Sequence, residues 1–144
     1  EKAHELEPTE LDYGLVLATA YLFTDQEDKW DNLYRYLSKE FPFKSEVWLD
    51  WGVALNETGQ IVRALEVTET GLENNPRSIQ LLYRMAALCY LSNNKEVSIL
   101  ILEKALELNP EEHSNMFIFA PELKKATSII ECISRFIRPT LNDE

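Results

Sequence analysis

The chain has 144 residues, 45% of them hydrophobic and 27% charged, a balance typical of a folded domain that excludes a disordered chain. Its 14 Lys and Arg residues against 25 Asp and Glu residues give a formal net charge of −11. We therefore expect no nucleic acid and no anionic membrane as partner, because both bind clustered positive charge. Only four glycines and six prolines are present, which disfavours a β-sandwich or barrel with frequent turns.

Three prolines indicate an internal repeat. Pro42, Pro76 and Pro110 lie 34 residues apart, and the same period aligns small residues with small ones and large apolar residues mostly with large apolar ones. Apolar residues also recur at helical spacing within each period. We therefore predict an all-α fold in which one helix pair repeats three times. The three repeats are residues 11–44, 45–78 and 79–112.

The first repeat is expected to form helices over residues 9–23 and 28–40. At the position where its two helices should approach closely it carries Trp30, whereas the later repeats carry the small Ala64 and Ser98. Two interpretations are open. Either the first pair is splayed or shifted in register, as terminal repeats often are, or the indole is exposed and contacts a partner.

The second and third repeats are expected to form pairs over 45–58 with 61–74 and over 79–92 with 95–108. Helix starts are marked by Ser45 and Ser78, residue types that favour the N-cap position. Before and after the repeats we expect a leader and a tail, which would be residues 1–8 and 139–144.

After Pro110 the repeat pattern decays without vanishing. A short helix near 113–119 and a longer one near 123–137 are predicted, the second with an apolar stripe at Leu123, Ala126, Ile130, Ile133 and Ile137. We interpret residues 113–138 as a degenerate fourth unit that covers the open end of the stack. The alternative is that its remaining apolar residues contact another chain, which would allow a homodimer through the C-terminal helices. Those residues are Ile118, Ile129 and Phe136.

The second repeat carries a recognisable signature. Its residues at the signature positions are Trp48, Trp51, Gly52, Leu55, Ala64, Thr68 and Pro76. This pattern resembles the tetratricopeptide repeat (TPR) family, and the other two repeats follow the same spacing. The resemblance implies an α-α superhelix, a solenoid of about three helix pairs with C-terminal capping helices. It also implies a concave groove, lined by the first helix of each pair, that holds an extended peptide or a partner's helix.

The signature spacing gives the groove-facing candidates on the three first helices. One TPR subgroup binds acidic chaperone tails through Lys and Asn in this groove, and only Arg84 fits that set here, so a strongly acidic peptide is not expected. Partial burial between neighbouring helices is the alternative for every candidate. The candidates are Leu15, Thr19, Leu22, Leu49, Val53, Asn56, Gln80, Tyr83, Arg84, Ala87 and Tyr90.

No catalytic constellation is visible. The sequence lacks metal-binding, nucleophile and phosphate-cradling motifs, and Cys89 and Cys132 lie among apolar residues, as buried structural thiols do. We expect no enzyme activity, no cofactor and no metal. The leading hypothesis is a cytoplasmic, non-catalytic protein-protein interaction scaffold. The alternative is an architectural or self-association module that forms the C-terminal part of a longer protein.

Overall fold

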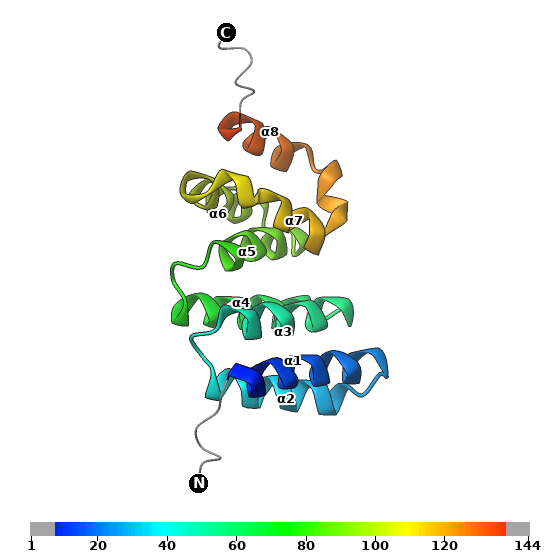
Figure 1. Cartoon of the computed structure of the whole chain (residues 1–144). Helices are drawn as coiled ribbons and strands as arrows, with labels where there is room; N and C mark the ends of the chain where they lie inside the picture. Colours follow the sequence, from blue (N-terminus) through cyan, green and yellow to red (C-terminus); the bar gives the residue numbers. More distant parts are fainter. Residues whose placement is uncertain (1–7, 138–144) are drawn as a thin grey trace. The chain divides into compact units, whose positions relative to one another are not determined.

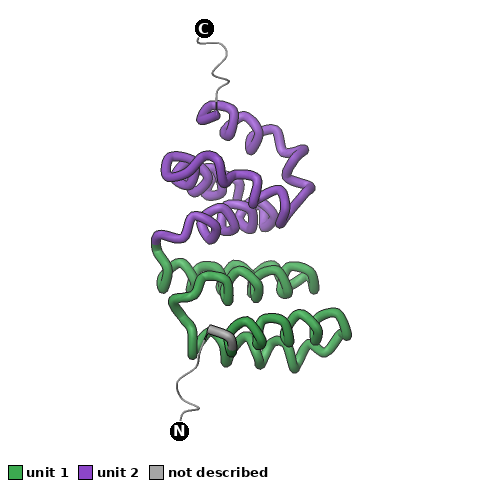
Figure 2. Tube along the Cα trace, in the orientation of Figure 1, with its two compact units in different colours: residues 1–76 green, residues 77–144 purple. Residues whose placement is uncertain are grey.

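The computed structural model describes residues 8–137, and all regular structure in that range is helical (Figure 1). The all-α prediction is therefore confirmed. The chain divides into two compact units, with the boundary between Pro76 and Arg77 (Figure 2). We call them unit 1 and unit 2.

Unit 1 contains two helical hairpins. The third helix also contacts the first and the second, which joins the two hairpins. Every helix boundary lies within one residue of the predicted one. The first hairpin is α1 (Pro8–Phe23) with α2 (Glu27–Glu40), and the second is α3 (Ser45–Glu57) with α4 (Ile61–Asn74).

Unit 2 begins with a third hairpin, α5 (Ile79–Leu91) with α6 (Lys95–Leu108). Its remaining helices cover this hairpin, since α7 (Ser114–Phe119) packs on α5 and α8 (Thr127–Phe136) packs on α6. Short 3-10 helices precede α7 and α8, at Pro110–His113 and Pro121–Lys125.

The three hairpin turns share one backbone geometry. Each turns through a residue with positive φ, 58° at Asp25, 80° at Gly59 and 70° at Asn93, and these positions lie 34 residues apart. The N–H of the following residue donates to the carbonyl five residues earlier, at 2.8–2.9 Å in all three turns. Asp, Gly and Asn are the residues that best tolerate the left-handed conformation. The repeat therefore extends to the local backbone conformation.

Two glycines lie in close contact with a large side chain of the paired helix. A Cβ atom added to Gly71 would lie 2.6 Å from the Cβ of Trp48, and one added to Gly14 would lie 2.9 Å from a methyl carbon of Leu37. These two pairs occupy equivalent positions, because residues 14 and 48, like residues 37 and 71, are 34 apart. The first hairpin has the glycine on its first helix and the second hairpin has it on its second helix. The packing therefore requires a certain combined side-chain volume at the two facing positions, and either helix can carry the glycine.

The exposed-indole interpretation of Trp30 is wrong. Trp30 is 1% exposed and packs edge-on against Tyr34, with ring centroids 6.3 Å apart. The close approach of Gly14 to Leu37 also shows that α1 and α2 are not splayed at this level.

The predicted continuous helix over 123–137 is wrong as well. Ala126 is extended, with φ −84° and ψ 105°, and α8 starts only at Thr127. Because of this break, the residues of α8 are rotated relative to those of a continuous helix. Ile129 is therefore buried, whereas Ile130 and Ile137 are exposed. Ile129 is thus part of the unit 2 core and is not available to another chain.

Candidate partner-binding surface

Six of the groove candidates lie together on the first helices of unit 1. All six are partly exposed, and α1 contacts α3. Four are aliphatic, and Thr19 and Asn56 add hydrogen-bonding groups. We call this set the first-helix surface. It consists of Leu15, Thr19 and Leu22 on α1 and Leu49, Val53 and Asn56 on α3.

Tyr34 of α2 is buried next to Thr19 of this surface. Burial raises the pKa of Tyr34 well above its usual range, the nearby Asp50 carboxylate raises it further, and a side-chain hydrogen bond with Thr19 opposes both effects. The Thr19 hydroxyl also donates to the Leu15 carbonyl at 3.0 Å. Tyr34 therefore stays a neutral phenol at physiological pH.

The α5 candidates divide into surface and core. Gln80 is exposed and Tyr90 partly exposed, whereas Tyr83 and Ala87 are 0% exposed. The Tyr83 hydroxyl donates to the Asn109 carbonyl at 2.7 Å. Burial raises the pKa of Tyr83 to about 12, with smaller contributions from Glu112 and Cys132. Tyr83 and Ala87 therefore belong to the core, in agreement with the alternative of burial between helices.

Arg84 is occupied within unit 2. Its guanidinium carbon lies 4.0 Å from the centre of the Phe119 ring on α7, the geometry of a cation–π contact. The one candidate that fits a carboxylate-binding subgroup is thus engaged with a neighbouring helix.

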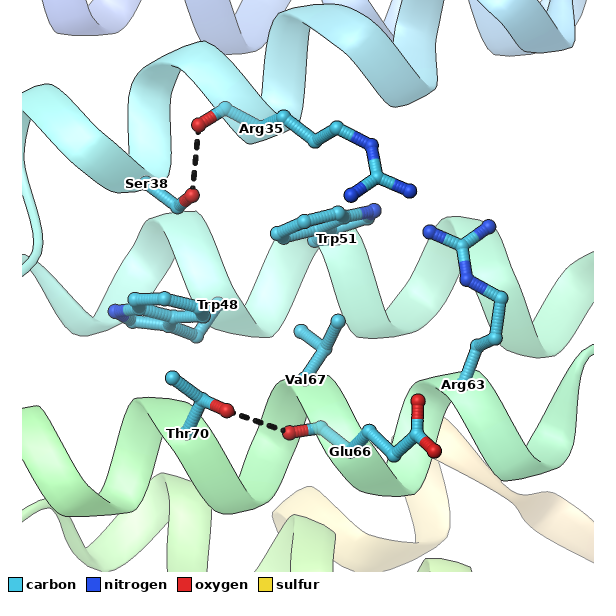
Figure 3. Close-up of a pocket in the computed structure, with 8 residues that line it drawn as sticks. All are labelled: Arg35, Ser38, Trp48, Trp51, Arg63, Glu66, Val67 and Thr70. Atoms are coloured by element: carbon cyan, nitrogen blue, oxygen red, sulfur yellow. Dashed lines mark hydrogen bonds between the residues drawn. The ribbon is translucent and has the colours of Figure 1, made fainter.

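A hollow of about 320 Å³ lies among α2, α3 and α4 of unit 1 (Figure 3). Two indoles form much of its wall, and the guanidinium of Arg35 lies 5.9 Å from the Trp51 ring centre. None of its lining residues is among the groove candidates predicted from the sequence. Its lining residues are Arg35, Ser38, Trp48, Trp51, Arg63, Glu66, Val67 and Thr70.

Three of the side chains that line the hollow, Arg35, Trp51 and Arg63, donate hydrogen bonds to Asp31. Asp31 accepts from the Trp51 indole N–H at 3.0 Å and from Arg63 at 3.0 and 3.3 Å, and Arg35 donates to it at 3.3 Å. The Trp48 indole N–H donates to the Pro42 carbonyl at 2.9 Å. A single carboxylate on α2 thus connects α3 and α4, which points to a role in holding the two hairpins together. Residues 32 positions apart share no periodic signal, so only the structure could reveal this network.

The described residues bear on two kinds of reactive centre, a metal-binding cluster and an activated thiol. Residues 8–137 contain no group of three or more His, Cys, Asp and Glu side chains that could hold a metal ion. The thiols of Cys89 and Cys132 are buried, and burial raises the pKa of the Cys132 thiol, which disfavours its reactive thiolate. None of the helices in this range is both long and apolar enough to cross a bilayer.

Comparisons with known proteins identify the fold. No family model matches the sequence, and no curated protein matches it. Among solved structures, the type III secretion translocator chaperone SycD of Yersinia enterocolitica is similar, with a TM-score of 0.65 and 15% identity over 93% of this chain and 95% of the SycD chain. The fold is TPR-like. At 15% identity this similarity shows the fold alone. It therefore supports a TPR-like helical-repeat fold and does not assign the chain to the TPR family.

Proposed function

We propose that this protein is a non-catalytic interaction scaffold that binds a segment of another protein on the first-helix surface of unit 1. The observation that carries the proposal is the grouping of six partly exposed residues, four of them aliphatic, on adjacent first helices. The fold similarity to a protein described as a translocator chaperone supports a partner that is itself a protein.

The surface chemistry defines the segment it would take. Leu15, Leu22, Leu49 and Val53 offer aliphatic contacts, and the Asn56 amide can both donate to and accept from a peptide backbone. The net charge of −11 would repel a strongly acidic segment. We therefore propose an apolar or amphipathic segment. Unit 2 by itself offers Gln80 and Tyr90 on α5 as candidate contacts to a partner.

An architectural or self-association role is the second candidate, and one observation favours it. Unit 2 exposes Ile118 on α7 and both Ile130 and Ile137 near α8. A depression of about 520 Å³ along α6, lined in part by Ile99 and Leu100, adds apolar surface. A homodimer through these helices would be detected by sedimentation equilibrium of wild type and of I118S. A monomer over the whole concentration range would contradict it.

A matched pair of substitutions tests the first-helix surface. Peptides of up to about 14 residues, the length of four helical turns, would be selected from a random display library on the wild-type protein. Their dissociation constants would then be measured by fluorescence anisotropy. We expect V53R to weaken their binding at least about tenfold, an effect of about 1.4 kcal/mol. V62R places the same charge on an exposed position of α4 and should leave binding unchanged. Equal effects of the two substitutions, or unchanged binding in V53R, would refute the proposed site.

A further inference from the structure

The outward side of α1 carries an exposed apolar stripe. Tyr13 is 69% exposed, Val16 68% and Phe23 79%, and Ala20 between them is exposed as well. Spacings of three, four and three residues place all four on one side of the helix. We call them the α1 outer stripe. None of them belongs to the first-helix surface.

This stripe lies opposite the face that α1 buries. Leu11, Gly14 and Ala18 are buried, and at about 100° per residue their mean direction is about 180° from that of the stripe. A helix that is apolar on opposite sides is normally covered on both. Other large exposed apolar residues of unit 1, such as Phe43 and Val62, stand outside α1 and need no such explanation. The pattern on α1 thus indicates an interaction surface.

Acidic side chains stand at both ends of the stripe. Residues 10–29 contain five carboxylates and one cation, Lys29, whose ammonium lies 5.5 Å from the Tyr21 ring centre. All five carboxylates are exposed, and no ion pair found in residues 8–137 involves them. Glu27 accepts a hydrogen bond from the Gln60 side-chain amide at 3.1 Å. They are Glu10 and Asp12 at one end and Asp25, Glu27 and Asp28 at the other.

The charge distribution decides between two kinds of occupant. If two copies paired their stripes antiparallel, Glu10 and Asp12 of one copy would face Asp25, Glu27 and Asp28 of the other. Parallel pairing would place Glu10 against its own counterpart. Both arrangements bring like charges together, which is unfavourable across an interface. A partner whose apolar residues are flanked by Lys or Arg meets no such repulsion.

We propose that the α1 outer stripe binds an amphipathic helix of a partner protein, with an apolar face bordered by Lys and Arg. From Tyr13 to Phe23 the stripe spans about 15 Å, or three helical turns. The complementary segment is therefore a helix of at least about 11 residues with apolar positions at i, i+3 and i+7. This surface is separate from the first-helix surface and extends the number of partners that unit 1 can hold.

Two synthetic helical peptides, each about 16 residues long, test this proposal by fluorescence anisotropy on the full chain. They share the same leucine stripe, and one carries Lys and the other Glu at the flanking positions. We expect the Lys peptide to bind at least about tenfold tighter at low salt, and its advantage to shrink as salt screens the charges. V16S should weaken Lys-peptide binding about tenfold, as expected for losing one buried valine contact.

Val62 provides a matched control, because it is 66% exposed and lies on α4. V62S should leave Lys-peptide binding unchanged, because Val62 lies outside the α1 outer stripe. D12K should narrow the difference between the two peptides. Equal binding of both peptides, or equal effects of V16S and V62S, would overturn the proposal. A homodimer that V16S dissociates in sedimentation equilibrium would overturn it too, in favour of a second copy.

Discussion

Unit 1 and unit 2 follow the same 34-residue period with different cores. Unit 1 is centred on aromatic rings, with Tyr34 stacked on Trp51 and Trp48 on Trp51 at centroid distances of 6.2 Å. Unit 2 relies on aliphatic side chains such as Leu88 and Leu102, both 0% exposed. The period therefore fixes which positions are buried, and each unit fills the resulting volume in its own way.

The two units also differ in how their apolar faces are covered. In unit 2, α7 and α8 lie on α5 and α6, so the last complete hairpin is shielded by further chain. In unit 1 the α1 outer stripe has no such cover among the described residues. Covering the helix pair is thus a structural need in unit 2, whereas the uncovered stripe of unit 1 is the surface proposed for binding.

Removing α7 and α8, which cover the hairpin of unit 2, should reduce stability more than any other change described below. A chain ending at Glu112 loses Met116, Leu123 and Ile129, all nearly fully buried, and each such burial is worth about 1.5–3 kcal/mol. Since a domain has only about 5–15 kcal/mol of net stability, we expect aggregation or a much lower melting temperature in circular dichroism. A chain ending at Ile137 is the control. Unchanged melting of the shorter chain would show that residues 113–138 are not a cap.

The glycine contacts should distinguish a rigid neighbour from an adaptable one. G71A places a methyl group against the Cβ of Trp48, which cannot rotate away, and should cost about 3 kcal/mol. G14A meets the end of the Leu37 side chain, which can move, and alanine favours the helix by about 1 kcal/mol. G14A should therefore be close to neutral in urea unfolding. A G14A variant less stable than G71A would contradict this account of the packing.

In urea unfolding, the ion pairs of the two units should contribute differently to the free energy of unfolding. D31A removes the acceptor shared by Trp51 and Arg63 in unit 1 and should cost about 1.5–3 kcal/mol, as for a partly buried charged hydrogen bond. E103A removes the exposed pair with Arg135 in unit 2 and should cost less than about 1 kcal/mol. Equal losses would mean that Asp31 does not connect the hairpins as proposed.

Alkaline pH should lower the stability of unit 2 through Tyr83, whereas Tyr83 should have no such effect at neutral pH. The pKa of Tyr83 is raised from 10.0 to about 12, so the unfolded chain releases this proton at lower pH than the folded one. The corresponding stability is present below pH 10 and is lost as the pH rises from 10 to 12. In urea unfolding, Y83F should therefore lose less stability than wild type across this interval. Parallel losses in both proteins would show that Tyr83 does not contribute.

The sequence determined the helices and their order. The 34-residue period and the apolar spacing placed the first six helices within one residue, because these signals are local. Ser78 acts as the predicted N-cap, its hydroxyl accepting from the Leu81 N–H at 3.2 Å. Ser45, by contrast, is the first residue of α3, and the N-cap is Lys44 without a side-chain bond.

Tertiary structure decided which face of each helix is covered and by what. Trp30 is a core residue, packed edge-on against Tyr34. Ile129 replaced Ile130 in the core because extended Ala126 restarts the helical phase before α8. The Asp31 network joins residues far apart in sequence. A periodic pattern gives the residues that share a face, whereas packing volume, phase breaks and long-range pairing depend on the neighbouring helices.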